Sequence, residues 1–371
     1  MVTLLRKGGR VLISACTREG SKLHMSQRTI CMLALPAYRR EFLLRLLVQD
    51  ETVRVMAGMH GFDIGVKTPS EFLGIVEQCP QCLFGPIGVQ RVLFHSAGDV
   101  VVHDLNPRVA TTWLTLLLRV FTKHRVLLWG HVAGGRRRKR LRRLMLRKAD
   151  GVVAYTEIER EQFLIEGAQK AFLAPNATRS VEGSPVVRPR KDRSGFVWLG
   201  RMVPGKNPLL AAAAYKIAVL EGVDTQLHPL RFVGDGPEMT RLKKFCRDNP
   251  DLNIYLHGED YESTRVDELV GQSIASLITG YAGLNVMDSL WNGTAVILID
   301  GGVAHSPEHT LVVNGVNGFR AASKEKSDFA AAITRAIDAN FSHLEIGAVH
   351  RRLHSAEAMV DGMLLAMADA E

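Results

Sequence analysis

The segment with the clearest capacity for chemistry is 200–208, GRMVPGKNP, which follows a short apolar run and leads into an alanine-rich stretch. In open α/β sheets, ligands bind at the carboxyl ends of the strands, so this loop should face a crevice. Arg201 and Lys206 would then lie together, where a planar guanidinium and a flexible ammonium can both bind a diphosphate. By itself, such a loop is equally typical of a basic surface turn.

A second segment of the same kind is 280–288, GYAGLNVMD. Gly283 permits a close approach of the backbone, and the amides at the start of a helix near Leu284 and Asn285 suit an anion. Asp288 would lie about two helical turns after Gly280, where its carboxylate could accept hydrogen bonds from a pair of ribose hydroxyls. Alone, a glycine at a helix start indicates only capping.

Between these two segments lies 232–237, FVGDGP, an apolar run that ends in a glycine-rich turn. Gly234 would let the chain pass beneath a ligand. The segment is not a dinucleotide fingerprint, because the third glycine of that pattern is absent. Taken alone, it indicates a tight turn between a strand and a helix.

The order of these segments resembles glycosyltransferase family 4. GRxxxxKNP, VGDGP and 280–288 are followed by NGTAV at 292–296 and NGVNGF at 314–319, so the resemblance covers residues 196–338. It implies an α/β chain with the GT-B fold, in which two Rossmann-like domains face each other across a cleft. It also implies that a sugar is transferred, with retained anomeric configuration, from a nucleoside diphosphate sugar to an acceptor hydroxyl. The reaction would need no metal or other cofactor and would belong to the synthesis of a cell-surface polysaccharide or glycolipid.

The resemblance also assigns roles to individual residues. Arg201 and Lys206 would act on the diphosphate, and the donor would be bound by Gly200, Gly234, Gly283, Leu284, Asn285 and Asp288. Asp288 takes the place of the family's second glutamate, which holds the ribose. Gly280 takes the place of the first, which commonly contacts the donor sugar. Since glycine has no carboxylate, another group takes over, donor preference differs, or activity is lost.

The first half of the chain resembles the family more weakly. His131, in LWGH, follows a predicted strand, and family members often keep a histidine there that faces the donor sugar; the alternative is a structural hydrogen bond. Acceptor-side candidates follow two other strands, at Tyr38, Arg39, Asn106 and Arg108. Asn176 resembles the family's Asn-Gly at the end of the first domain, or is simply a turn residue.

Residues 136–148 form a predicted helix with nine basic residues and no acidic residue. Leu141, Leu144 and Met145 are spaced for one helical face. We expect its basic residues, beginning with Arg136, Arg137, Arg138 and Arg140, to bind an anionic membrane surface that carries a lipid-linked acceptor. The alternatives are a solvated charged face or a nucleic-acid site. The low share of aromatic residues, 6%, argues against a nucleic-acid site because few rings are present to stack on bases.

Alternating apolar and amphipathic stretches predict two series of βα units. The first has strands at 29–33, 52–57, 100–103, 126–129, 151–155 and 171–174, and the second at 196–199, 230–233, 253–256, 275–277 and 295–298. We therefore expect an appendage at 1–24, an acceptor domain at 25–177, a linker at 178–195, a nucleotide-sugar domain at 196–340 and a helical segment at 341–371.

Composition is consistent with this plan. A chain of 371 residues with 46% hydrophobic and 23% charged residues fits two folded domains. The longest apolar stretch, 113–121, is too short to span a membrane, and the first 22 residues do not resemble a signal peptide. We therefore expect a cytoplasmic protein that is peripheral at the inner face of the membrane. Five cysteines with one close pair, Cys79 and Cys82, favour unbridged thiols over zinc.

Two rival functions stay open. The missing carboxylate at Gly280 is also consistent with a non-catalytic sugar-nucleotide or glycan-binding protein of the same fold. A sugar-nucleotide epimerase is the other, and the Arg201 to Lys206 loop argues against it.

Overall fold

The computed structural model describes residues 26–370 except 63–66, 94, 133–135 and 261, without the side chains of 136–138 and 263. The predicted appendage at 1–24 lies outside the described residues. Within those that are described, no helix is both long and apolar enough to cross a bilayer.

The first domain is built on a parallel sheet with the strand order β3-β2-β1-β6-β7-β8-β9. The six predicted strands are confirmed to within one or two residues, as β1 (Arg28–Met32), β2 (Arg54–Ala57), β6 (Val100–Asp104), β7 (Arg125–Trp129), β8 (Gly151–Ala154) and β9 (Ala171–Leu173). The sequence did not predict β3 (Glu77–Gln78) or the antiparallel pair β4 (Gln81–Phe84) and β5 (Ile87–Gln90). These three strands are short and largely exposed, so they lack an apolar run.

Helices cover both faces of this sheet because successive side chains of a strand point to opposite sides. In β7, Leu127 belongs to one core and Leu128 to the other. On the Leu128 side lie α2 (Ala110–Thr122), α3 (Arg136–Lys148) and α4 (Glu157–Ile165). On the Leu127 side lie α1 (Arg40–Gln49) and α11 (Ala356–Ala370).

The second domain has a six-stranded parallel sheet with the order β12-β11-β10-β13-β14-β15. Its strands are β10 (Phe196–Leu199), β11 (Leu230–Val233), β12 (Ile254–Leu256), β13 (Ala275–Ile278), β14 (Ala295–Ile299) and β15 (Gly318–Ala321). All but β15 were predicted. The flanking helices are α5 (Pro208–Leu220), α6 (Met239–Asp248), α7 (Ser263–Gly271), α8 (Leu284–Trp291) and α9 (Lys326–Asp338).

Each sheet has one point at which the strand order reverses. In the first sheet the chain moves outward from β1 and returns to its other side as β6, and in the second it does the same at β10 and β13. The connections on the two sides of such a point leave in opposite directions and open a crevice at the carboxyl ends of the strands. The segments 200–206 and 279–283, which follow β10 and β13, therefore meet at one crevice.

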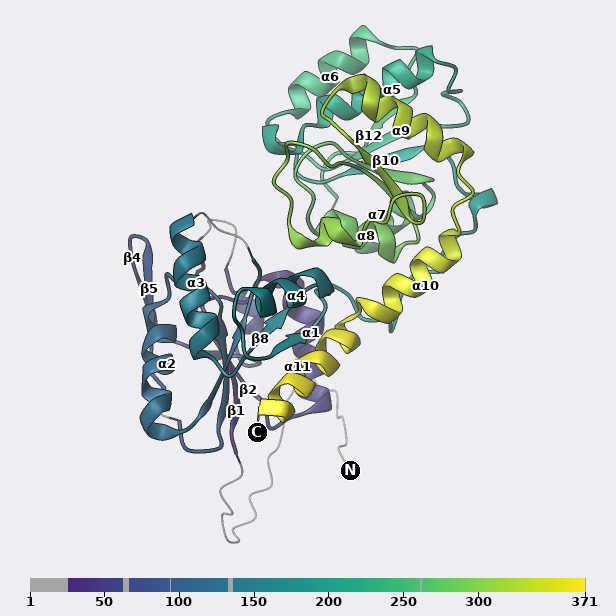
Figure 1. Cartoon of the computed structure of the whole chain (residues 1–371). Helices are drawn as coiled ribbons and strands as arrows, with labels where there is room; N and C mark the ends of the chain where they lie inside the picture. The colour runs from purple at the N-terminus through teal and green to yellow at the C-terminus, as the bar shows by residue number, and fades with distance from the viewer. Residues whose placement is uncertain (1–25, 63–66, 94, 133–135, 261, 371) are drawn as a thin grey trace.

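The last two helices tie the domains together. Helix α10 (His343–Leu353) packs against α8 of the second domain, and α11 returns to the first, as the yellow ribbon in Figure 1 shows. Met359, Met363 and Met367 of α11 are fully buried in the same core as Ile30 of β1. The predicted helical segment is therefore divided, with α10 on the second domain and α11 in the core of the first.

Candidate functional site

The crevice of the second domain brings Lys206 to the approach of helix α8. Lys206 ends a short 3-10 helix (Pro204–Lys206), and its Nζ donates a 2.6 Å hydrogen bond to the carbonyl oxygen of Tyr281. The ammonium also lies 4.7 Å from the centre of the Tyr281 ring. Burial and the neighbouring charge of Arg201, whose side chain is exposed, lower the pKa of Lys206 to about 8. Lys206 thus contacts Tyr281, which is two residues before Gly283, and it lies within reach of the charge of Arg201.

Glycines allow the loops of this crevice to pack backbone against backbone. A Cβ atom at position 280 would lie 2.2 Å from the carbonyl oxygen of Gly205 and 2.7 Å from Cα of Lys206. The backbone amide of Tyr281 donates to that same Gly205 oxygen at 3.1 Å. Likewise, a Cβ at Gly234 would lie 1.9 Å from the carbonyl oxygen of Gly200. The loop that carries Lys206 therefore occupies the space that a side chain at 280 would need.

The backbone before α8 is fixed by side chains. The amide of Gly283 donates to Oδ1 of Asn285 at 3.0 Å, and the amide of Ala282 donates to Nδ1 of His305 at 3.0 Å. Helix α8 begins at the predicted Leu284. Because the first amides of a helix have no partner within it, this end can accept an anion.

Asp288 has a partner that the motif did not reveal. Its carboxylate pairs with Arg179 of the 178–195 segment at 3.1 Å, and Arg179 also binds Asp267 at 2.5 Å. Burial raises the pKa of Asp288, and the guanidinium opposes that shift. A ribose at this position would have to share the carboxylate with Arg179 or replace it.

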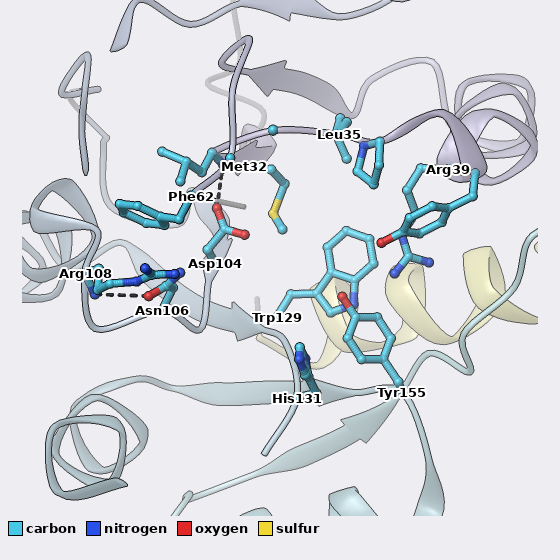
Figure 2. Close-up of a pocket in the computed structure, with 15 residues that line it drawn as sticks. Met32, Leu35, Arg39, Phe62, Asp104, Asn106, Arg108, Trp129, His131 and Tyr155 are labelled. Atoms are coloured by element: carbon cyan, nitrogen blue, oxygen red, sulfur yellow. Dashed lines mark hydrogen bonds between the residues drawn. The ribbon is translucent and has the colours of Figure 1, made fainter. Parts of the chain in front are cut away.

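The first domain has a cavity of about 220 Å³ at the carboxyl ends of its strands. The residues predicted on the acceptor side and the predicted histidine all line it, namely Tyr38, Arg39, Asn106, Arg108 and His131. Figure 2 shows the last four of them around the cavity. They come from the segments after β1, β6 and β7. Parallel strands end at the same edge of a sheet, which explains why residues far apart in sequence meet here.

Arg39 is buried at the inner wall of the cavity. Its guanidinium lies 5.0 to 5.1 Å from the ring centres of Tyr38, Trp129 and Tyr155. One nitrogen donates to Oδ1 of Asn176 at 2.7 Å, and Asn176 in turn donates to Glu308 of the second domain. Arg39 and Asn176 thus connect the cavity wall to the other domain.

Sequence reasoning missed Asp104, the last residue of β6. One carboxylate oxygen accepts a hydrogen bond from the amide of Leu33 at 2.5 Å, and the group stands on the cavity wall between Met32 and Asn106 (Figure 2). Burial raises its pKa to about 7, and the Leu33 amide opposes this only in part. An aspartate at the end of an otherwise apolar strand, VVVHD, was the signal available in the sequence.

His131 follows β7 at the edge of the same cavity. Its ring centre lies 6.2 Å from that of Tyr155, and partial desolvation lowers its pKa although the residue keeps an exposed face. The next amide, of Val132, donates to Glu159 at 2.9 Å. Sequence reasoning also missed Glu159. Its backbone amide donates to the Thr156 hydroxyl at 3.2 Å, and this capping of α4 is indicated in the sequence by the pattern Thr-x-x-Glu.

The basic helix α3 has a different environment from the one predicted. Arg142 is buried and pairs at 3.0 Å with Glu166, which directly follows α4, and Lys139 approaches the same carboxylate at 3.5 Å. An acidic partner for the basic helix, absent from its own sequence, is therefore supplied by the residue that follows α4. Arg140 is exposed, and the side chains of Arg136, Arg137 and Arg138 lie outside the described part of the structure.

Among the described residues, no group of three or more histidine, cysteine, aspartate or glutamate side chains is arranged to hold a metal ion.

Two parallel sheets, each with one reversal of its strand order, define the class of fold, and comparison with solved structures gives its name. No protein-family model matches the chain, and no curated protein matches its sequence. The lipopolysaccharide outer core galactosyltransferase WaaB superposes with a TM-score of 0.64 at 14% identity, covering 92% of this chain and 99% of that one.

Two further structures superpose over a similar extent. The pneumococcal O-GlcNAc transferase GtfA, in complex with UDP and GlcNAc, gives a TM-score of 0.58 at 12% identity over 93% of this chain and 99% of its own. A trehalose-6-phosphate protein from E. coli, bound to UDP-2-fluoro glucose, gives 0.58 at 10% identity over 92% and 98%. The chain therefore has the GT-B fold predicted from its motifs.

Proposed function

We propose that this chain is a retaining glycosyltransferase of family 4 that moves a sugar from a nucleoside diphosphate sugar to an acceptor hydroxyl. The observation that carries the proposal is the placement of Lys206 on the Tyr281 carbonyl, beside Arg201 and at the approach to α8. In this proposal, the two cations and the helix start act together where a diphosphate gains charge on leaving. Preorganised groups of this kind stabilise a transition state strongly because they need no rearrangement.

The remaining donor contacts follow from the same crevice. Gly200 and Gly234 let the loops approach each other closely enough to form its floor. The amides of Leu284 and Asn285 would bind a phosphate oxygen, and Asp288 would accept hydrogen bonds from the ribose while paired with Arg179.

We place the acceptor in the cavity of the first domain. Tyr38, Arg39, Asn106 and Arg108 would orient it, and the Asp104 carboxylate would accept a hydrogen bond from one of its hydroxyls. His131 would face the donor sugar. In the reaction, the bond from the anomeric carbon to the diphosphate breaks, a bond to the acceptor oxygen forms on the same face, and the acceptor proton passes to the departing phosphate.

The acceptor that we propose is a glycan or a lipid-linked glycan of cell-surface polysaccharide or glycolipid synthesis, met at the cytoplasmic face of the membrane. The cavity supports a sugar-like ligand because aromatic rings, a carboxylate and guanidinium groups line it together. Such a mixture of apolar faces and hydrogen-bonding groups is typical of small-molecule sites.

The test measures turnover across a panel of sugar nucleotides. Lys206→Ala and Arg201→Ala should each reduce turnover by about a hundredfold or more, with an unchanged circular dichroism spectrum. Lys216→Ala, which removes an exposed lysine of α5 remote from the crevice, is the matched control and should keep normal turnover. Near-normal turnover in both crevice variants would remove the site assignment.

A second function has one observation in its favour. The space that a carboxylate at position 280 would need is filled by the Lys206 loop, as expected for a non-catalytic sugar-nucleotide or glycan-binding protein. Calorimetry together with donor hydrolysis separates the two functions. Binding without transfer or hydrolysis, across many donors and acceptors, would establish the binding protein.

A further inference from the structure

Helix α2 buries three threonines beside Leu116 and exposes most of its other large apolar residues. Thr111, Thr112 and Thr115 are at most 3% exposed. On the opposite side, Leu117, Val120 and Phe121 are 60%, 70% and 78% exposed. A helix on the surface of a soluble domain ordinarily has the reverse arrangement, with its apolar stripe toward the core.

Hydrogen bonds hold the helix in this orientation. The Thr111 hydroxyl accepts from the Gln90 amide at 2.7 Å and donates to the Gln90 carbonyl at 3.0 Å. Near the start of the helix, the Trp113 indole donates to the Pro107 carbonyl at 3.1 Å. Rotating the helix to bury Leu117 would break these bonds, so the apolar side stays outward.

Basic residues flank this apolar side. Helix α3 packs beside α2, and Arg119 of α2 donates to the Lys148 carbonyl at 2.5 Å. Both helices lie on the outer side of the first domain (Figure 1). Helix α3 adds two half-exposed leucines, Leu141 and Leu144, among exposed Arg140 and Arg147. Lys123 and Arg125, just after α2, are also exposed.

We propose that this surface docks onto an anionic lipid bilayer. The docking face consists of Leu114, Leu117, Val120, Phe121, Leu141 and Leu144 together with Lys123, Arg140 and Arg147. Its apolar side chains would enter the boundary between headgroups and acyl chains, and its cations would meet the phosphates. A second copy of the chain fits less well, because it would bring like charges together.

The proposal rests on the exposed side chains alone and holds whether or not the chain transfers sugars. The docking face belongs to the same domain as the cavity, because α2 begins at Ala110, two residues after Arg108, which lines that cavity.

The test is sedimentation of the full chain with vesicles of phosphatidylcholine alone or mixed with phosphatidylglycerol. The wild type should bind the mixed vesicles, and Leu117→Ser/Phe121→Ser should weaken binding by about tenfold or more for each side chain withdrawn from lipid. Arg140→Gln/Arg147→Gln should remove much of the salt-sensitive part of the binding. The matched control, Leu220→Ser/Leu365→Ser, removes two exposed leucines outside the docking face and should bind like the wild type.

A Phe121→Trp variant supplies a second measurement in an otherwise intact docking face. Its fluorescence should shift to the blue with mixed vesicles and be quenched by brominated acyl chains. The proposal is overturned if the wild type does not bind, if the serine pair in α2 binds as well as the control, or if the new tryptophan stays in water. It is also overturned if light scattering finds a dimer that the serine pair converts to a monomer, since the face would then be a subunit interface.

Discussion

The close packing at Gly280 leads to a prediction that separates the structure from the motif. One alternative left open by the motif is that activity is lost at Gly280, in which case glutamate there would restore a missing carboxylate and raise activity. The structure predicts the reverse, because a Cβ there would lie 2.2 Å from the Gly205 carbonyl oxygen, well short of the 3.4 Å at which ordinary contact begins. The atoms that this Cβ would meet, the Gly205 carbonyl oxygen and Cα of Lys206, belong to the backbone, so no side-chain rotation can relieve the overlap.

The size of the effect follows from that geometry. Forcing one methyl group into a packed site costs about 1–3 kcal/mol, so Gly280→Ala should lower the free energy of unfolding by that amount. The 200–206 loop would shift and carry the Lys206 ammonium away from the Tyr281 carbonyl. Losing a preorganised group of this kind costs about a hundredfold in turnover, and donor binding should weaken as well. Gly280→Glu should be worse on both measures.

Urea denaturation measures the first effect, with an unchanged slope to show that the same surface is exposed on unfolding. Titration calorimetry with the donor measures the second. Gly205→Ala is the matched control for stability, because no atom lies within 4 Å of a Cβ there, and its free energy of unfolding should stay within about 0.5 kcal/mol of the wild type. Wild-type stability and donor affinity in Gly280→Ala, or a gain of activity in Gly280→Glu, would refute the reasoning.

Three further predictions concern charges and a contact between the domains. Lys206 loses its proton as the pH rises through about 8, so donor affinity should fall above that pH in calorimetric titrations. Lys206→Arg should remove this pH dependence, and equal donor affinity of the wild type at pH 7 and 9.5 would contradict the prediction. Burial raises the pKa of Asp104 to about 7, so its protonated form is favoured in the fold, and this contribution to stability is lost as the pH rises from about 4 through 7. Asp104→Asn should flatten that part of the pH profile in urea titrations and lower turnover with unchanged donor affinity, whereas a profile identical to the wild type would exclude the shift. Asn176→Ala leaves Arg39 and Glu308 without their shared amide, which should lower the free energy of unfolding by about 1–3 kcal/mol, and an unchanged urea midpoint would show that this buried contact contributes nothing.

The sequence alone predicted most of the two sheets. Their inner strands, such as 126–129 and 196–199, are continuous apolar runs, because a parallel sheet covered by helices is buried on both faces. Short exposed strands carry no such pattern, so β3, β4 and β5 were not predicted. The motif spacing also placed Lys206 and Gly283 correctly after their strands, since a loop at the end of a parallel strand has only one edge of the sheet to occupy.

Tertiary structure decided what those residues touch. The crowding at Gly280 depends on a loop more than 70 residues earlier, and Asp288 pairs with Arg179 across 109 residues. Arg142 finds Glu166 only because α3 and α4 lie side by side on the sheet. The pKa of Asp104 depends on how completely water is excluded around it. Local spacing determines helices, strands and turns, whereas desolvation and long-range pairing exist only once distant segments have packed together.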